Sequence, residues 1–364
     1  MFKTMLRRIG YLLGAILGTL LLAECGVRAT GVADRSLVDT LYYTGYDREV
    51  HRVSETPGVF YELAPGTKMQ SLQGFDEHSP VPADLAAGDL DESGGRPYSV
   101  SISEHGTRGP TYPEPKAEEV FRVHFFGAST LYGAGMNNNE TMAAYLQGAL
   151  EELAPPGQRI EVWNYGTSAY VLTQMALLAQ RELEDHDPDL ILVLHTNVGR
   201  RPFLQYSDAS FYREQLATIP GLLRENFLPG CRDWDWDWTA PMAWSHAYQA
   251  VVLSWARDQI ASCPPKSEET QFLLLPQLVE RAQAAGVAIQ FIAAAGEPAQ
   301  SQESVYPTVP DTLFWSLQLM EREAVFYDLH PSPRILKEHA GRLAEELAKR
   351  RLVPTSKESP APRP

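Results

Sequence analysis

Short apolar runs alternate with helix-like segments from about residue 119 onward. The runs read VHFF, IEVWN, LILVLH, VAIQFIAAA and VFYD, and segments such as ETMAAYLQGALEEL, LTQMALLAQRELEDH and QLVERAQAA lie between them. Each run is too apolar for a strand with one face in water, which indicates a parallel sheet covered on both faces. Because strand and helix alternate, the connections are expected to be right-handed crossovers. The pattern predicts an α/β fold with a doubly wound, flavodoxin-like parallel sheet in three α/β/α layers.

Two segments of this half differ from the alternation. Residues from about 200 to 268 are long, aromatic and contain CRDWDWDWTAPMAW, so we expect an insertion with helices of its own. The last periodic segment, HPSPRILKEHAGRLAEELAKR, predicts a helix with Ser332 as its N-cap and Pro333 at its first position.

The first 30 residues have the layout of an export signal. Basic residues at positions 3, 7 and 8 precede an uncharged run from residue 9 to residue 23. This arrangement is typical of a secretory signal peptide or a short signal-anchor helix, and it places the rest of the chain outside the cytoplasm. We expect a protein anchored to the cytoplasmic membrane that faces the periplasm or the cell exterior, or a secreted one if the signal is cleaved.

These patterns divide the chain into four parts. Residues 1–30 are the signal or anchor, and residues 31–118 are an irregular N-terminal extension with short β-prone pieces. Residues 119–352 form the α/β domain with its insertion. Residues 353–364 are rich in Pro, Ser and charged side chains, which predicts a disordered tail.

Composition adds two constraints. The formal net charge is -15, so there is no field of Lys and Arg to neutralise phosphates, and nucleic acid is excluded as a partner. Three cysteines occur, and Cys25 lies in the apolar N-terminal segment. In an oxidising compartment Cys231 and Cys263 form a disulfide, or else they are two buried free thiols; the sequence leaves both open.

Polar residues follow the predicted strands and meet at one edge of the sheet. Ser129 follows the first strand, NYGTSAY the second, HTNV the third and YDLHPSP the last. Open parallel sheets bind ligands at this carboxyl edge. Together the segments supply a hydroxyl, a glycine N–H, an Asn amide, and a His close to an Asp, which are the groups that acyl transfer requires.

These segments resemble the four blocks of the SGNH (GDSL-type) hydrolase superfamily. FFGASTLYG is similar to the first block, WNYGTSAYVLTQ to the second, PDLILVLHTNV to the third and YDLHPSP to the last. The upstream SVSISEHGTRGP also resembles a segment that precedes the catalytic domain in membrane-anchored bacterial members. The resemblance covers roughly residues 95 to 350 without the insertion.

The resemblance implies roles for individual residues. Ser129 is the expected nucleophile, His330 the general base, and Asp328 the carboxylate that orients the imidazole. The expected oxyanion hole consists of the N–H groups of Ser129 and Gly166 and the side chain of Asn197.

Three further residues lie near these groups in the predicted site. His195, Asn164 and Arg200 are candidates for substrate contact or for support of the site. The chain departs from the family where Asp328 and His330 are separated by one residue, and where His195 and Val198 replace a Gly and an Asp.

Structural roles compete with the catalytic ones. Ser129 at a strand-to-helix turn is also a typical helix cap, Asn197 a typical turn residue, and His330 a possible packing residue. The α/β-hydrolase elbow G-x-S-x-G is excluded, because Leu131 stands at the final glycine position.

The Trp-rich run in the insertion has two interpretations. The segment 233–238 spaces its Asp residues like a calcium loop, but Trp238 and Trp244 stand where that loop needs Gly and Glu. Its three Trp side chains share one face, so they either stack on sugar rings or pack the insertion onto the sheet.

The sequence therefore predicts an extracytoplasmic serine esterase or O-acyltransferase. The expected substrate is an O-acyl ester, such as an acetyl ester, of an envelope glycan or lipid, and no cofactor or metal is expected. The alternative is a non-catalytic glycan-binding or structural protein on the same fold.

Overall fold

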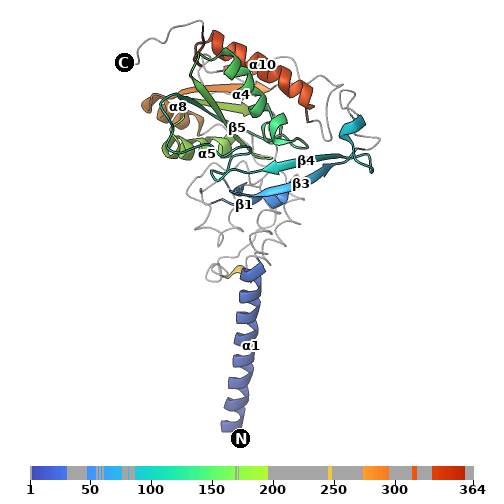
Figure 1. Cartoon of the computed structure of the whole chain (residues 1–364). Coiled ribbons are helices and arrows are strands. Elements are labelled where there is room, and N and C mark those ends of the chain that lie inside the picture. Colours follow the sequence, from blue (N-terminus) through green and yellow to red (C-terminus); the bar gives the residue numbers. More distant parts are fainter. Residues whose placement is uncertain are drawn as a thin grey trace, which may run out of the picture.

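A five-stranded parallel sheet forms the centre of the structure, a computed structural model (Figure 1). Its strand order is β6-β5-β7-β8-β9, and every neighbouring pair is parallel. Numbered along the sheet, this is the 2-1-3-4-5 order of flavodoxin-like folds. The predicted doubly wound α/β fold is confirmed. The strands are β5 (Val120–Gly127), β6 (Arg159–Gly166), β7 (Leu190–His195), β8 (Ala288–Ala294) and β9 (Phe314–Leu317).

The structure describes residues 2–30, 47–54, 61–75, 87–168, 172–195, 245–247, 274–294, 314–317 and 330–356, together with residues 56, 59, 81 and 170. Four of the predicted strands match β5 to β8. The fifth predicted run, VFYD at 325–328, lies outside the described residues, and β9 was not predicted.

Helices cover both faces of the sheet (Figure 1). On one face, α4 (Met142–Leu153) and α10 (Pro333–Lys349) share a core with Val123, Phe125 and Leu192 of the strands. On the other, α5 (Leu172–Asp185) and α8 (Leu275–Ala284) contact each other. The predicted start of α10 is confirmed, since Ser332 Oγ accepts the N–H of Ile335 and Pro333 is its first residue.

The N-terminal extension packs against the α/β domain. Its described part contains two antiparallel pairs, β1 (His51–Val53) with β2 (Tyr61–Leu63), and β3 (Lys68–Gln73) with β4 (Arg96–Ser101). Tyr98, Val100 and Ile102 of this extension share a buried cluster with Tyr132 and Ala134. The extension is therefore fixed to the segment that follows β5.

Helix α1 (Phe2–Thr30) is long and apolar enough to cross a membrane, a test that a signal sequence also passes (Figure 1). Near its end, Glu24 accepts hydrogen bonds from Ser245 Oγ at 2.7 Å and from the N–H groups of residues 246 and 247. These three residues are the only described part of the predicted insertion. Cys231, Cys263 and the Trp-rich run 233–238 lie outside the described residues.

The disordered tail was predicted to begin at residue 353, which is too early, because Val353 and Ser356 contact the folded domain. Val353 is buried in the main core, and Ser356 N–H donates to Leu153 O at 2.9 Å. The apolar Val353 extends the contact of α10 with α4, and the backbone bond fixes the chain after it. Residues 357–364 lie outside the described part of the chain.

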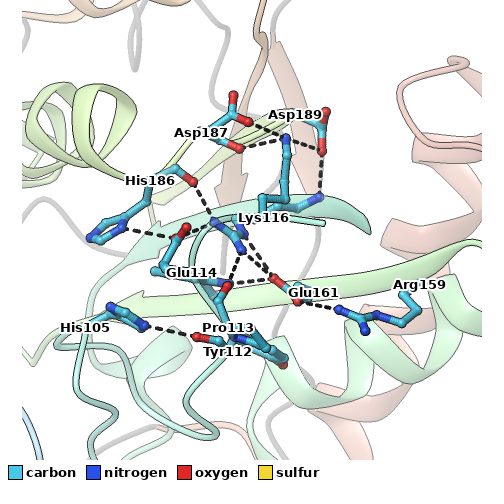
Figure 2. A network of polar contacts seen from close by, with 12 residues as sticks. His105, Tyr112, Pro113, Glu114, Lys116, Arg159, Glu161, His186, Asp187 and Asp189 are labelled. Atoms are coloured by element: carbon cyan, nitrogen blue, oxygen red, sulfur yellow. Dashed lines mark hydrogen bonds and ion pairs between the residues drawn. The ribbon is translucent and has the colours of Figure 1, made fainter. Parts of the chain in front are cut away.

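Polar groups of three segments, with Glu114, Glu161 and His186 among them, gather near the start of β5 (Figure 2). Arg122 is fully buried, and its guanidinium donates to Glu161 Oε2 at 3.0 Å, to Glu114, and to the carbonyl of His186 at 2.8 Å. The ring of Trp163 lies 4.5 Å from its guanidinium carbon. The cation is thus paired and hydrogen-bonded, as a buried charge must be.

Replacing Arg122 with Met is expected to lower the free energy of unfolding by about 3–5 kcal/mol, because the buried Glu161 then keeps only the half-exposed Arg159 as a cationic partner. Urea unfolding of the full chain in detergent measures this loss. The control is Arg342→Met on α10, where the pair with Glu338 is exposed. That variant is expected to lose less than about 1 kcal/mol. Equal losses in the two variants would contradict the stabilising role of the buried network.

Candidate active site

Ser129 is the first residue of a short helix that follows β5 directly. This helix, α3 (Ser129–Tyr132), has Ala128 as its N-cap, without a side-chain capping bond. The turn is tight, because a Cβ on Gly127 would lie 2.7 Å from Leu131 Cβ and 3.3 Å from Leu194 O. Since Ser129 does not occupy the N-cap position, the alternative that it caps the helix is wrong.

His330 reaches Ser129 from a segment 201 residues later. Its Nε2 lies 2.6 Å from Ser129 Oγ, in a partly buried contact. His330 itself is 9% exposed and lies two residues before Ser332, the cap of α10. For Nε2 to accept the Ser129 proton, the neutral ring must carry its hydrogen on Nδ1. The packing alternative for His330 does not account for this contact with a hydroxyl.

Gly166, whose N–H is a predicted oxyanion donor, is the last residue of β6. Its N–H donates to Asn164 Oδ1 at 2.9 Å, so it already has an acceptor within the protein. A Cβ at this position would lie 2.2 Å from Tyr132 N and 2.6 Å from Leu131 C. Glycine is required here because the end of β6 passes against the backbone of α3.

Asn164 joins β6 to α3 from within the core. Its Nδ2 donates to Leu131 O at 3.0 Å, while its Oδ1 accepts the Gly166 N–H. The residue is buried, so both ends of its amide are occupied by the protein. This arrangement supports the turn that carries Ser129 and leaves no described contact for a substrate.

Several predicted site residues cannot be placed. Asp328, Asn197 and Arg200 lie outside the described residues. His195 is the last residue of β7, next to β5 in the sheet, but its side chain is not described. Their predicted roles stay predictions. Within the described ranges, no group of three His, Cys, Asp or Glu side chains is arranged to hold a metal ion.

Sequence reasoning missed the residues that surround the far end of α3. Arg108 donates to the carbonyls of Tyr132 and Gly133, and Tyr132 Oη donates to Asp47 at 2.7 Å. Arg108 lies in the segment SVSISEHGTRGP, which resembles a segment of the family, but the sequence predicts no role for this residue. Asp47 has no local signal, because its partner is 85 residues away along the chain.

His51 packs beside the same tyrosine. Its ring is buried, its Nδ1 donates to Asp47 O at 2.9 Å, and the ring of Tyr132 lies 6.2 Å away. Burial lowers the pKa of His51 from 6.5 to about 4, against the smaller opposing effect of the bond to Asp47. The neutral form of His51 is therefore part of the folded structure.

The chain matches no protein-family model and no curated protein. It is similar to solved structures that include psychrotrophic esterase EstA from Pseudoalteromonas sp., with 14% identity, a TM-score of 0.35, and coverage of 63% of this chain and 97% of that chain. Another is an acetyl xylan esterase, Est2A, from the rumen bacterium Butyrivibrio proteoclasticus, with 13% identity, a TM-score of 0.34, and coverage of 67% and 66%.

A third similar structure is a member of the lipolytic protein G-D-S-L family from Veillonella parvula DSM 2008. It has 14% identity and a TM-score of 0.26, and the match covers 63% of this chain and 99% of that chain. All three TM-scores lie below 0.5, so these likenesses carry no functional argument for this chain.

Replacing Gly166 with Ala is expected to disrupt the turn that carries Ser129, because the added methyl overlaps the backbone of α3. Such overpacking costs about 1–3 kcal/mol or more when the neighbouring backbone cannot move to relieve it. Thermal unfolding of the full chain in detergent measures the loss. The control is Gly148→Ala on α4, where a Cβ meets nothing within 4 Å. A Gly166→Ala chain as stable as wild type would contradict the close approach.

The stability of the chain is expected to fall between pH 6.5 and pH 4 through His51. The unfolded chain binds a proton at this residue from pH 6.5 downward, whereas the folded chain does so only near pH 4. The loss attributable to His51 is about 3 kcal/mol over this window. Urea unfolding of wild type and of His51→Gln from pH 4 to pH 8 measures this loss. The contributions of the other histidines cancel when the free energy of unfolding of one chain is subtracted from that of the other. A difference independent of pH would contradict the prediction.

Proposed function

We propose that the chain is a serine ester hydrolase of the SGNH type, with Ser129 as the nucleophile and His330 as the general base. The observation that carries this proposal is the 2.6 Å separation of Ser129 Oγ and His330 Nε2. A nucleophile and a base within hydrogen-bond distance are the minimum requirement for covalent acyl transfer. The position at the carboxyl end of β5, beside β7, supports it, because flavodoxin-like sheets bind ligands at this switch point.

In the first half of the reaction, Ser129 Oγ attacks the ester carbonyl and His330 Nε2 takes its proton. The carbonyl oxygen becomes negatively charged in the tetrahedral intermediate. When the intermediate collapses, the imidazolium returns the proton to the leaving alcohol, and the acyl group remains on Ser129. The same base then activates water, or an acceptor alcohol, to release the acyl group.

The oxyanion requires donors near Ser129. The N–H of Ser129 is at the start of α3, where helix N–H groups have no intrahelical acceptor, and no described residue accepts it. The side chain of Asn197 remains the second proposed donor. The N–H of Gly166, which donates to Asn164 Oδ1 in the structure, remains the third proposed donor. Asp328 is proposed to hold the imidazole of His330, and His195 and Arg200 to contact the substrate.

The proposed location is the outer face of the cytoplasmic membrane, with α1 retained as an anchor. Basic residues before the apolar run support this orientation. The bonds of Glu24 to residues 245–247 support retention, because cleavage of α1 would remove them. The proposed substrate is an O-acyl ester of an envelope glycan or lipid, which this location makes accessible.

The full chain in detergent is expected to hydrolyse p-nitrophenyl acetate. Ser129→Ala is expected to abolish turnover, because the hydroxyl that attacks is gone. His330→Gln is expected to reduce kcat by about 100- to 10,000-fold, the usual contribution of a general base. Release of p-nitrophenol measures both rates.

The control is Ser93→Ala, which removes an exposed serine hydroxyl that donates to Asp91 in the turn between β3 and β4. Its rate is expected to equal that of wild type. Equal rates for wild type and Ser129→Ala would contradict the proposal. A folded wild-type chain without hydrolysis that binds an acetylated glycan would favour the non-catalytic alternative.

A further inference from the structure

Arg108 closes the end of the helix that carries Ser129. Its side chain is almost fully buried, at 3% exposure of the residue. One guanidinium nitrogen donates to Tyr132 O and to Gly133 O, both at 2.7 Å, and the other donates to Met136 O. The guanidinium carbon also lies 4.4 Å from the centre of the Tyr132 ring. A single side chain of the N-terminal extension thus contacts the last residue of α3 and the turn after it.

The end of α3 requires such a partner. A helix leaves its last carbonyls without intrahelical donors, and α3 has only four residues. Its chain direction reverses at Gly133, which has a positive φ of 83°. Buried carbonyls without donors cost about 1–3 kcal/mol each. A planar guanidinium with several N–H groups satisfies more than one carbonyl at once.

Arg108 is itself held by the strand beside the nucleophile. Its backbone N–H donates to Asn164 O at 2.9 Å, and it forms an isolated bridge with that residue. Asn164 in turn donates from its side chain to Leu131 O. The end of β6, Arg108 and α3 therefore form one connected set of hydrogen bonds.

A second residue of the extension holds the other end of Tyr132. Asp47 Oδ2 accepts the Tyr132 hydroxyl at 2.7 Å, and its Oδ1 accepts the Tyr98 hydroxyl at 2.7 Å. Arg108 thus contacts the main chain and ring of Tyr132, while Asp47 contacts its hydroxyl. Ser129 lies three residues before Tyr132 in the same short helix.

We propose that Arg108 and Asp47 are positioning residues for Ser129, and that the N-terminal extension is consequently part of the catalytic unit. This inference rests on the proposed function. The two residues do not contact the reacting atoms. They fix the end of α3, and through it the distance from Ser129 Oγ to His330 Nε2. Displacement of a reacting group by about 1 Å reduces the rate about 100-fold.

The test compares Arg108→Lys with wild type on p-nitrophenyl acetate, using the full chain in detergent. Lys keeps the charge but lacks the planar fork that contacts several carbonyls. We expect kcat to fall about 10- to 100-fold while KM changes less than about 3-fold, because positioning of the nucleophile, not substrate binding, is altered.

The matched control is Arg122→Lys. Arg122 is equally buried and also donates to backbone carbonyls, but it lies at the start of β5, away from Ser129. We expect its kcat to stay within about 3-fold of wild type in the folded fraction. Equal losses of kcat in the two Lys variants, or no loss in Arg108→Lys, would overturn the positioning role of Arg108.

Tyr132→Phe tests the Asp47 contact and remains available if Arg108→Lys does not fold. It removes only the hydroxyl that Asp47 accepts, and kcat is expected to fall at unchanged KM. A wild-type kcat in this variant overturns the positioning role of Asp47. A wild-type chain without esterase activity instead overturns the proposed function, and this inference with it.

Discussion

The hydrogen-bond contact between Ser129 Oγ and His330 Nε2 is the interaction on which the account of this protein depends. It joins two elements that are remote in sequence and are each fixed independently. Ser129 begins α3, whose position follows from the tight turn after β5 and the close passage of β6 at Gly166. His330 precedes α10, which begins at the Ser332 cap and packs with α4 into the main core. The site therefore has the rigidity of the sheet that carries it.

The N-terminal extension has a larger part in this arrangement than its irregular sequence indicates. Its described residues contact α3 through a guanidinium, a carboxylate and a small apolar cluster. Further bonds tie Tyr61 to Ser168 and Gln174 to Val59, beyond the end of β6. A hydrophobic core alone would leave the carbonyl of Tyr132, the last residue of the short helix that carries Ser129, without the donor that Arg108 supplies. The extension therefore contributes to the structure of the segment that carries Ser129.

Sequence patterns predicted much of the fold because its signals are local. Apolar runs marked β5 to β8, and the Ser-Pro pair marked the start of α10. The pairing of Ser129 with His330 was expected from the family resemblance and from strand ends meeting at one edge. The short β9 lacked a distinctive run, and Val353 looked like part of a polar tail. The oxyanion role of Gly166 came from the family resemblance, whereas its close approach to Tyr132 N depends on tertiary packing and has no local signal. The contacts of Arg108 and Asp47 depend on tertiary packing and have no periodicity.

Covalent labelling tests whether Ser129 is a nucleophile that His330 activates, as we propose. The full chain is incubated in detergent with a fluorophosphonate, digested, and its peptides are analysed by mass spectrometry. We expect a phosphonyl adduct on the oxygen of Ser129, formed much more slowly in a folded His330→Gln chain. Labelling at a different serine, or no adduct on a folded wild-type chain, would contradict it.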